Sequence, residues 1–381
     1  MVASPLRLCL VALVACLVAA VPAAGAERRA PFGFQGVDYD REASWGPAGV
    51  QDEMWRAMAA NGVESARVLF DWSEAQPTAG GAVSFHETDP LVARAALRGI
   101  DLLPVVIYTP RWARIVSGEK HSAPADPKQY TAYLTTLIGR YGEAGTFWAE
   151  HPELPRRPLR TWQIWNEPDM EYQWVPRDDW QARYGKLLRD ARDAIRAADP
   201  GARVVLAGLT NSSWISLRSL YKLGGIRGAF DVAALNAYTR EPKNLVEIVR
   251  RGRKEMQKRG DGKKPIRVTE FGASASEGRI KVGRDRDHLQ TTDRKLAKLV
   301  LNAYDALAAN RRKLRIEAAY WYTWASSYRS DGDIFDFSGL VRYAEGSNEF
   351  AAREALPAYR KSARRLEGCA KGESSACVSR R

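Results

Sequence analysis

Cysteine and histidine are scarce in this sequence. Its 381 residues include 4 of each, and no Cys/His spacing is typical of a zinc site. The histidines are scattered, and none has a sequence neighbour that suggests catalysis: His86, His121, His151 and His288. We therefore expect no metal and no cofactor.

Long apolar runs are also missing, apart from one near the start. Leu8 to Val21 is apolar and follows Arg7, and Ala24-Gly25-Ala26 then offers a small-x-small cleavage site. The run is too short for a comfortable membrane span. We predict a signal peptide over residues 1–26 and a secreted, periplasmic or extracellular protein. Lipoprotein anchoring at Cys16 is a second interpretation, which the apolar residues beyond Cys16 disfavour.

No Pro/Ser-rich linker, low-complexity tract or internal repeat divides the rest of the sequence. Residues 27–368 are therefore expected to form one domain, and residues 369–381 a short C-terminal tail. Cys369 and Cys377 lie in that tail, and a disulfide between them would suit an exported protein. The sequence does not reveal whether they pair.

Acidic residues do not balance the basic ones. The formal charge of +13 becomes +12 without Arg7. Much of the excess gathers in two clusters: Arg250, Arg251, Arg253, Lys254, Lys258, Arg259, Lys263 and Lys264, then Arg311, Arg312, Lys313 and Arg315. Such clusters can attract an anionic polysaccharide, a cell envelope or nucleic acid. Solvated helix faces are the simpler interpretation, and export argues against nucleic acid.

Eight short apolar runs alternate with helical patterns, which is typical of a parallel sheet built from βα units. The runs lie near residues 33–38, 64–71, 100–108, 160–166, 203–209, 230–236, 266–270 and 316–323. Helices are predicted from Trp180 to Ala198 and from Leu289 to Leu307 by three- and four-residue apolar spacing. Eight units favour an α/β fold closed into a (β/α)8 TIM barrel. No Gly-x-Gly-x-x-Gly opens the first helix, which disfavours a dinucleotide site.

Two glutamates follow two of these runs. Glu167 comes after residues 160–166, and Glu270 ends residues 266–270. A (β/α)8 barrel carries its chemistry at the carboxyl ends of its strands, so closure would bring these two remote carboxyl groups together. Paired carboxyl groups of this kind cleave glycosidic bonds: one protonates the leaving oxygen, and the other attacks the sugar or activates water.

Several motifs extend this pattern across nearly the whole chain. They are Arg67, Thr109-Pro110-Arg111-Trp112, Arg140-Tyr141-Gly142, Trp165-Asn166-Glu167-Pro168, Asn236-Ala237-Tyr238, Thr269-Glu270-Phe271-Gly272 and Tyr320-Trp321. In this order the sequence resembles the retaining glycoside hydrolases of clan A, most closely the family 39 and family 5-type enzymes.

The resemblance implies a role for each matched residue. Glu167 would be the general acid/base and Glu270 the nucleophile. Asn166 would bind the sugar hydroxyl beside the reacting carbon, and Arg67 and Tyr238 would hold the carboxylate of Glu270. The family often has His-x-Tyr where this chain has Asn236 before Tyr238, which puts the polar network around the sugar in question.

Aromatic and acidic residues give further expectations. The resemblance implies that the sugar stacks on Trp321. Among the 12 tryptophans, Trp72, Trp112 and Trp324 either line neighbouring subsites or only pack. The acidic loop 331–336 is expected to be a solvated rim rather than a calcium site. Asn211-Ser212-Ser213 is a glycosylation sequon, should the host glycosylate.

These observations predict a secreted enzyme, a retaining glycoside hydrolase that cleaves a β-linked polysaccharide or oligosaccharide by double displacement. We expect a monomer, and the basic surface favours an anionic glycan. Two alternatives from other classes stay open. One is a carbohydrate-binding barrel of the envelope or matrix without turnover, and the other is a basic, adhesin-like surface protein. The sequence indicates neither the sugar, nor the linkage, nor endo or exo action.

Overall fold

The computed structural model describes residues 28–39, 44, 46–284, 286–329, 332–344 and 346–368. The predicted signal peptide, Cys16, and the tail with Cys369 and Cys377 lie outside the described residues. Among the residues that are described, no helix is long and apolar enough to span a membrane.

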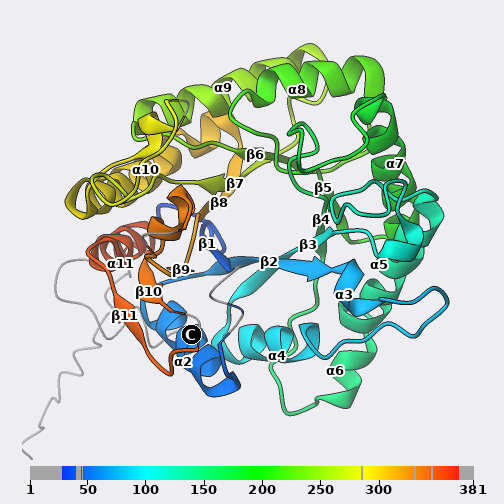
Figure 1. The fold of residues 1–381 in the computed structure, drawn as a ribbon, viewed down its shortest axis with the longest axis horizontal. Helices are drawn as coiled ribbons and strands as arrows, with labels where there is room; N and C mark the ends of the chain where they lie inside the picture. The colour runs from blue at the N-terminus through cyan, green and yellow to red at the C-terminus, as the bar shows by residue number, and fades with distance from the viewer. Residues whose placement is uncertain are drawn as a thin grey trace, which may run out of the picture.

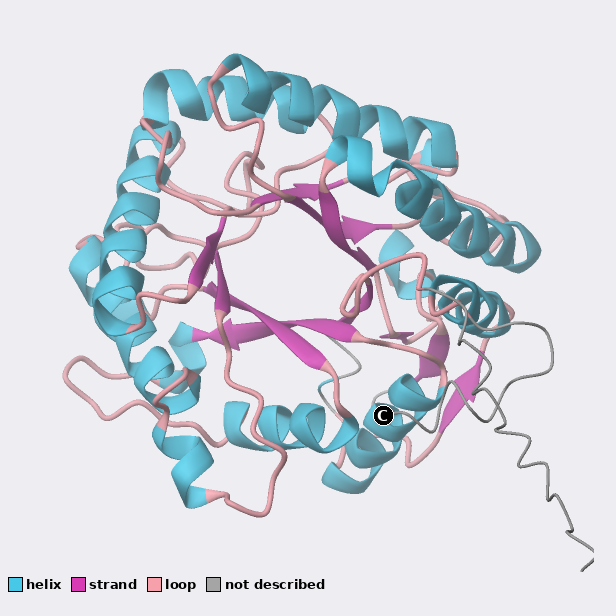
Figure 2. Ribbon diagram, turned by 180° about the vertical axis from the view of Figure 1, so that it is seen from behind, coloured by secondary structure: helices cyan, strands magenta, loops and turns pink. Residues whose placement is uncertain are grey.

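Eight parallel strands form a ring with helices around it (Figures 1 and 2). The strands are β1 Gln35–Tyr39, β2 Ser65–Asp71, β3 Asp101–Ile107, β4 Thr161–Ile164, β5 Arg203–Val205, β6 Ala233–Asn236, β7 Ile266–Phe271 and β8 Ile316–Trp321. Their order is β5-β4-β3-β2-β1-β8-β7-β6. Isolated bridges Val205↔Val232 and Leu209↔Leu235 join β5 to β6 and close the ring. The predicted (β/α)8 barrel is confirmed.

α-Helices surround the ring (Figure 1). They are α2 Ala48–Ala60, α3 Trp72–Ala75, α4 Thr88–Arg98, α5 Pro127–Tyr141, α6 Thr146–Glu150, α7 Trp180–Ala198, α8 Ser213–Ser219, α9 Pro242–Lys258, α10 Asp293–Leu314 and α11 Ala355–Leu366. Shorter helical turns are η1 Arg111–Ala113, η2 Leu220–Gly224, η3 Asp287–Leu289 and η4 Ile334–Phe337. Their apolar faces and the outer strand residues form the larger hydrophobic core.

The predicted elements occur in the predicted order, but several bounds differ. The fifth run was expected over residues 203–209, whereas β5 covers only Arg203–Val205, and the sixth was expected from residue 230, whereas β6 begins at Ala233. The fourth run was expected to reach residue 166, but β4 ends at Ile164 because Trp165 turns to a positive φ of 69°. The helix expected from Leu289 begins at Asp293 instead. Thr292 caps it by accepting a hydrogen bond from the Lys295 amide, and Leu289 belongs to η3.

A small second sheet was not predicted. It contains β9 Ala325–Ser326, β10 Val341–Tyr343 and β11 Phe350–Ala352 in the order β11-β10-β9. In Figure 1 it lies beside the barrel, next to α2 and α11. Its strands have two or three residues each, which is too short for a periodic pattern to stand out in the sequence.

The inside of the barrel is divided into layers. Its middle is a separate apolar cluster of Leu103, Val205, Val232, Ala234, Ala318 and Tyr320. Polar side chains occupy both ends: Arg67, Gln163 and Glu270 toward the carboxyl ends of the strands, and Thr161, Arg267 and Glu317 toward their amino ends. The barrel is therefore a filled core with two polar faces and not a pore.

Four residues of the first basic cluster form ion pairs: Arg250, Arg251, Lys258 and Lys264. Glu247 pairs with both Arg250 and Arg251 on α9. Arg253 is different because it is buried and donates to the backbone carbonyls of Leu314, Gly262 and Lys264. It therefore joins α9 to the neighbouring loops and contributes no exposed charge.

Two helical glycines give a matched test of this packing. A Cβ at Gly185 of α7 would lie 1.9 Å from the carbonyl oxygen of Gly224, whereas one at Gly139 of α5 would have no neighbour within 4 Å. Gly185→Ala should lower the free energy of unfolding by about 1–3 kcal/mol through overpacking. Gly139→Ala should raise it by about 0.5–1 kcal/mol, because alanine loses less backbone entropy in a helix. Urea unfolding of both variants measures the difference, and equal effects would contradict the contact.

Candidate active site

Glu167 lies on a turn that the backbone holds tightly. Trp165 and Glu167 both have positive φ values, 69° and 46°, which side-chain-bearing residues adopt at a cost. The Trp165 amide donates to the carbonyl of Val106 at 3.0 Å, and the Glu167 amide donates to that of Gly208 at 2.9 Å. These bonds to the neighbouring strands keep the turn in place and let the carboxyl group of Glu167 face the barrel axis.

A cavity of about 730 Å³ opens at the carboxyl ends of the strands. Glu167 and Glu270 both line it, although 103 residues separate them in sequence (270 − 167). The other polar side chains in its wall include Arg67, His121, Asn166, Gln173, Thr210, Asn211, Tyr238, Arg286, His288 and Asp333. Closure of the barrel thus brings the two carboxyl groups to one site, as the sequence predicted.

Arg67 of β2 links the polar side chains at the floor of this cavity. Its Nη1 donates to Asp38 at 2.6 Å and to Glu270 at 2.8 Å, and its Nη2 donates to Asn166 Oδ1 at 2.8 Å. Its Nε donates to Gln163 at 3.0 Å. The side chain is only 2% exposed, so these charge-assisted bonds form away from water. One guanidinium therefore fixes the position of Glu270 relative to Asn166.

Asn236 of β6 contacts the other glutamate. Its Nδ2 donates to Glu167 Oε1 at 2.9 Å and to Asn166 Oδ1 at 3.3 Å, while its Oδ1 accepts from the Thr269 hydroxyl at 2.7 Å. Burial, and then the negative charge of Glu270, raise the pKa of Glu167, and the bond from Asn236 partly opposes that rise. The carboxyl group of Glu167 is therefore protonated at pH values where an exposed glutamate is not.

Gly208 makes this contact between amides possible. A Cβ at this position would lie 2.4 Å from Asn236 Oδ1 and 3.0 Å from Asn166 Oδ1. No other residue leaves room for both amide groups, so Gly208 belongs to the site although it has no side chain.

Tyr238 binds the carboxylate of Glu270. Its hydroxyl donates to Glu270 Oε2. Burial, and then the charge of Glu270, raise the pKa of Tyr238 well above its usual value, so it stays a donor. The amide of Asn211 clamps the Tyr238 backbone, donating to its carbonyl at 2.9 Å and accepting from its N–H at 2.6 Å. Because this amide is used inside the cavity, Asn211 is a poor glycosylation acceptor.

Asp169 supports the loop that carries Glu167. Its carboxylate accepts from the Thr210 amide at 3.1 Å, the Thr210 hydroxyl at 2.9 Å and the Ser216 hydroxyl at 2.7 Å. Burial raises its pKa against these three donors. It joins the segment after β4 to the segment after β5 at the rim of the cavity.

Trp321, which was expected to stack on the sugar, does not lie where that role requires. Trp321 is fully buried, donates through its indole N–H to the Ser338 carbonyl at 3.0 Å and packs on Phe271. It does not line the cavity, because the side chains of successive strand residues point to opposite faces. The next residue, Tyr322, lines it instead, together with Phe335. Its ring lies 5.9 Å from that of Tyr238, centroid to centroid.

The other candidate tryptophans pack rather than bind. Trp72 and Trp324 are fully buried, and Trp112 meets Trp72 edge to face at 5.6 Å. None of the three lines the 730 Å³ cavity. The contacts that the structure gives Trp72 and Trp112 are packing contacts.

In the acidic loop, Asp331 lies outside the described residues. Asp333 and Asp336 form a reciprocal capping box at the start of η4, and Asp333 also reaches the cavity wall. Within the described ranges, no group of three or more His, Cys, Asp or Glu side chains is arranged to hold a metal ion.

Several members of the site were not predicted from the sequence. Asp38, Gln163, Asp169, Gly208 and Tyr322 were not singled out, and neither was the place of His121 in the cavity wall. A polar residue inside an apolar strand was the available signal for Asp38 and Gln163, since a buried polar group needs a partner. No comparable signal marks Gly208 or Tyr322.

Comparisons with known proteins support the fold. No protein-family model and no curated protein matches the chain. A monomeric beta-xylosidase from Caulobacter crescentus CB15 superposes with a TM-score of 0.64 at 16% identity, over 88% of this chain and 69% of that one. A family 39 glycoside hydrolase from Bacteroides cellulosilyticus WH2 gives 0.62 at 15%, over 88% and 64%. A family 1 b-glucosidase from Thermotoga maritima gives 0.61 at 11%, over 91% and 100%.

At these identities the likeness concerns the fold alone. This chain has the (β/α)8 barrel that those glycoside hydrolases have, and the resemblance to clan A noted in the sequence holds at that level. What the chain does must be argued from its own cavity.

Removal of Arg67 tests how far the site depends on it. Arg67→Met would leave Asp38 and Glu270 buried without their shared cation, so the free energy of unfolding should fall by about 3–5 kcal/mol. Adding Asp38→Asn should recover part of the loss. Arg56→Met, which removes an exposed pair with Glu53, is the control and should change little. Denaturant unfolding measures all three, and similar values for Arg67→Met and Arg56→Met would refute the argument.

Proposed function

We propose that this protein is a retaining glycoside hydrolase that cleaves a β-linked polysaccharide or oligosaccharide. One observation carries the proposal: Glu167 and Glu270 line the same cavity, and their environments differ. Glu167 accepts one amide hydrogen bond, whereas Glu270 accepts from a guanidinium and a phenol. Two carboxyl groups held in different environments suit two different roles in glycosidic-bond cleavage.

Glu167 is the proposed acid and base. Because the Asn236 amide donates to Oε1, the proton of the neutral carboxyl group belongs on Oε2, which is free to deliver it to the glycosidic oxygen. The C–O bond to the leaving group breaks as this proton is transferred. The ionised Glu167 then keeps the Asn236 bond and accepts a proton from the water that enters.

Glu270 is the proposed nucleophile. Arg67 and Tyr238 hold its two oxygens, and either oxygen can attack the anomeric carbon as the leaving group departs. A glycosyl ester forms on Glu270. The water activated by Glu167 then attacks the same carbon, the ester bond breaks, and the carboxylate returns to its two donors. Two inversions give net retention.

Asn166 is the proposed contact to the sugar hydroxyl beside the reacting carbon. Its Oδ1 already accepts from Arg67 and Asn236, so the orientation of the amide is fixed and its NH2 group is directed elsewhere. An amide donor held in this way strengthens its bond as charge develops in the transition state. Tyr322, rather than Trp321, is the proposed stacking surface.

Export belongs to the proposal as well. The predicted signal segment, residues 1–26, supports secretion or a periplasmic or extracellular location, and a glycan substrate is consistent with that. The net positive charge supports an anionic glycan, and the protein is proposed to act as a monomer.

Digestion of a glycan panel tests the main claim. Wild type should release reducing ends from one class of β-linked glycan, and proton NMR of the first product should show the anomer of the substrate. Glu270→Gln should lower kcat by at least about 10³-fold, because an amide is no nucleophile. Glu167→Gln should lower it most for substrates with poor leaving groups.

Glu277→Gln, which changes an exposed glutamate outside the cavity, is the control. Glycan binding without any release of reducing ends would favour the alternative of a non-catalytic binding barrel. Wild-type turnover by Glu270→Gln would remove that residue from the mechanism, and an inverted product would replace double displacement by single displacement.

The pH profile tests the contact between Asn236 and Glu167. Glu167 must be protonated to act as the acid, and its raised pKa places the alkaline limb of kcat/KM above the ordinary range of a glutamate. Asn236→Ala removes a donor that stabilises the ionised form, so the pKa should rise further and the limb should move up by about one pH unit. The limb should not move in Asn310→Ala, which alters an amide on α10. A downward move would contradict the assignment.

A further inference from the structure

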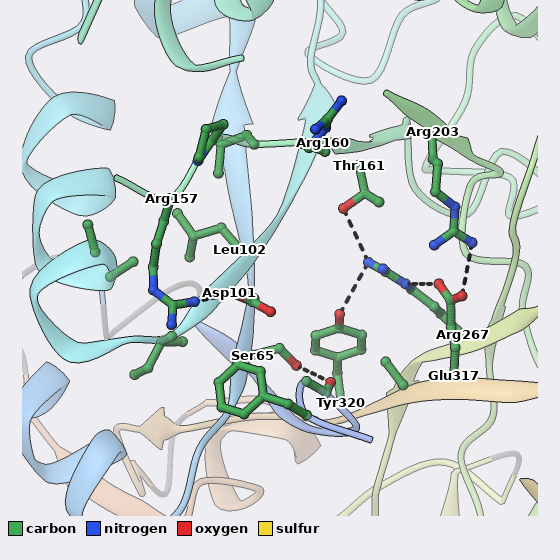
Figure 3. Close-up of a pocket in the computed structure, with 18 of the residues that line it drawn as sticks. Ser65, Asp101, Leu102, Arg157, Arg160, Thr161, Arg203, Arg267, Glu317 and Tyr320 are labelled. Carbon is green, nitrogen blue, oxygen red and sulfur yellow. Dashed lines mark hydrogen bonds and ion pairs between the residues drawn. The ribbon is translucent and has the colours of Figure 1, made fainter. Parts of the chain in front are cut away.

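A second cavity lies at the other end of the barrel, where the strands begin. Its volume is about 490 Å³, within the range of small-molecule sites. Arg203 begins β5, and Arg267 and Glu317 are the second residues of β7 and β8, so the cavity opens on the face opposite Glu167 and Glu270. The two cavities have no lining residue in common. Figure 3 shows the polar side chains of the second one.

Positive charge exceeds negative charge in its wall. Four guanidinium groups line the cavity, those of Arg157, Arg160, Arg203 and Arg267, against two carboxylates, those of Asp101 and Glu317. Glu317 is shared: its Oε1 accepts from Arg267 at 2.6 Å and its Oε2 from Arg203 at 2.9 Å. Arg160 pairs instead with Glu143 and Asp199, which lie outside the cavity lining.

Arg267 has unused hydrogen-bonding capacity. Its side chain is 13% exposed, yet only Nε makes a short bond, the one to Glu317. Nη1 lies at 3.4 Å from the Thr161 hydroxyl and 3.5 Å from that of Tyr320, and Nη2 has no partner among the described residues. In Figure 3 the guanidinium points between Thr161 and Tyr320. A guanidinium has five N–H donors, so an acceptor from outside the protein would complete its bonds.

Apolar side chains also line the cavity: Val92, Ala95 and Ala96 of α4 and Leu102 of β3. In Figure 3 Leu102 lies on the side away from Arg203 and Arg267, next to the ion pair of Arg157 and Asp101. A ligand that fits both kinds of lining has a negatively charged head group and a small body with apolar faces. A free metal cation is disfavoured, because cations outnumber anions in the lining.

We propose that this cavity binds a small organic oxyanion, a carboxylate or phosphate on a body of about monosaccharide size, with Arg203 and Arg267 as the head-group ligands. The site is independent of the proposed glycosidase activity. A sugar acid and inorganic phosphate offer the same head-group chemistry, and they differ in whether they have a body to meet the apolar side chains of α4.

Calorimetric titration of the full-length protein at low salt tests the proposal, with sodium glucuronate, inorganic phosphate and glucose as probes. Glucuronate should bind saturably and glucose should not. If glucuronate binds more tightly than phosphate, the apolar side chains contribute to binding. If the two affinities are equal, the site recognises the anionic head group alone. Saturable binding of neither anion would overturn the proposal.

Two variants with opposite expected effects locate the binding. Arg203→Gln removes a head-group ligand and should weaken anion binding at least about tenfold. Glu317→Gln removes the competing carboxylate and should tighten it at least about threefold, since the two arginines then lack an internal anion. A purely structural ion pair predicts lower stability in both variants and no gain in affinity.

Arg192→Gln, on the exposed face of α7, is the matched control for lost positive charge and should bind like wild type. Arg203 is partly exposed, so its variant is expected to fold, and circular dichroism checks this for all three. Equal affinity in Arg203→Gln and Arg192→Gln would place the anion elsewhere and overturn the assignment.

Discussion

Arg67 is a buried cation that donates to two carboxylates and two side-chain amides at once, and the geometry of the cavity follows from it. Its bonds to Asp38, Glu270 and Asn166 join β1, β2, β7 and the turn after β4. A buried carboxylate without such a partner would be strongly unfavourable. The same interaction therefore stabilises the carboxyl end of the barrel and holds Glu270 in place.

The two glutamates differ because their neighbours differ. Glu270 has a guanidinium and a phenol on its oxygens, whereas Glu167 has one amide and the negative charge of Glu270 nearby. Asn236 stands where a histidine is common in the resembling families. Its amide donates to Glu167 and Asn166 and accepts from Thr269, so uncharged side chains form the polar network at this position.

Sequence patterns predicted the strands, the barrel and the meeting of Glu167 with Glu270, because apolar periodicity and strand ends are local features. They did not predict which side chain at the end of a strand points into the cavity. Trp321 and Tyr322 are adjacent aromatics at the end of β8, and only the direction of each side chain decides that Tyr322 lines the wall and Trp321 does not. Asp38 and Gln163 were missed for a related reason, since their partner Arg67 lies on another strand.

Gly208 has an evolutionary consequence. The space beside its Cα is filled by the amide oxygens of Asn236 and Asn166, which a methyl group would displace. In any descendant of this chain, a larger residue at position 208 would be tolerated only together with replacements at positions 166 and 236. Positions 166, 208 and 236, although distant in sequence, are therefore expected to covary among related sequences.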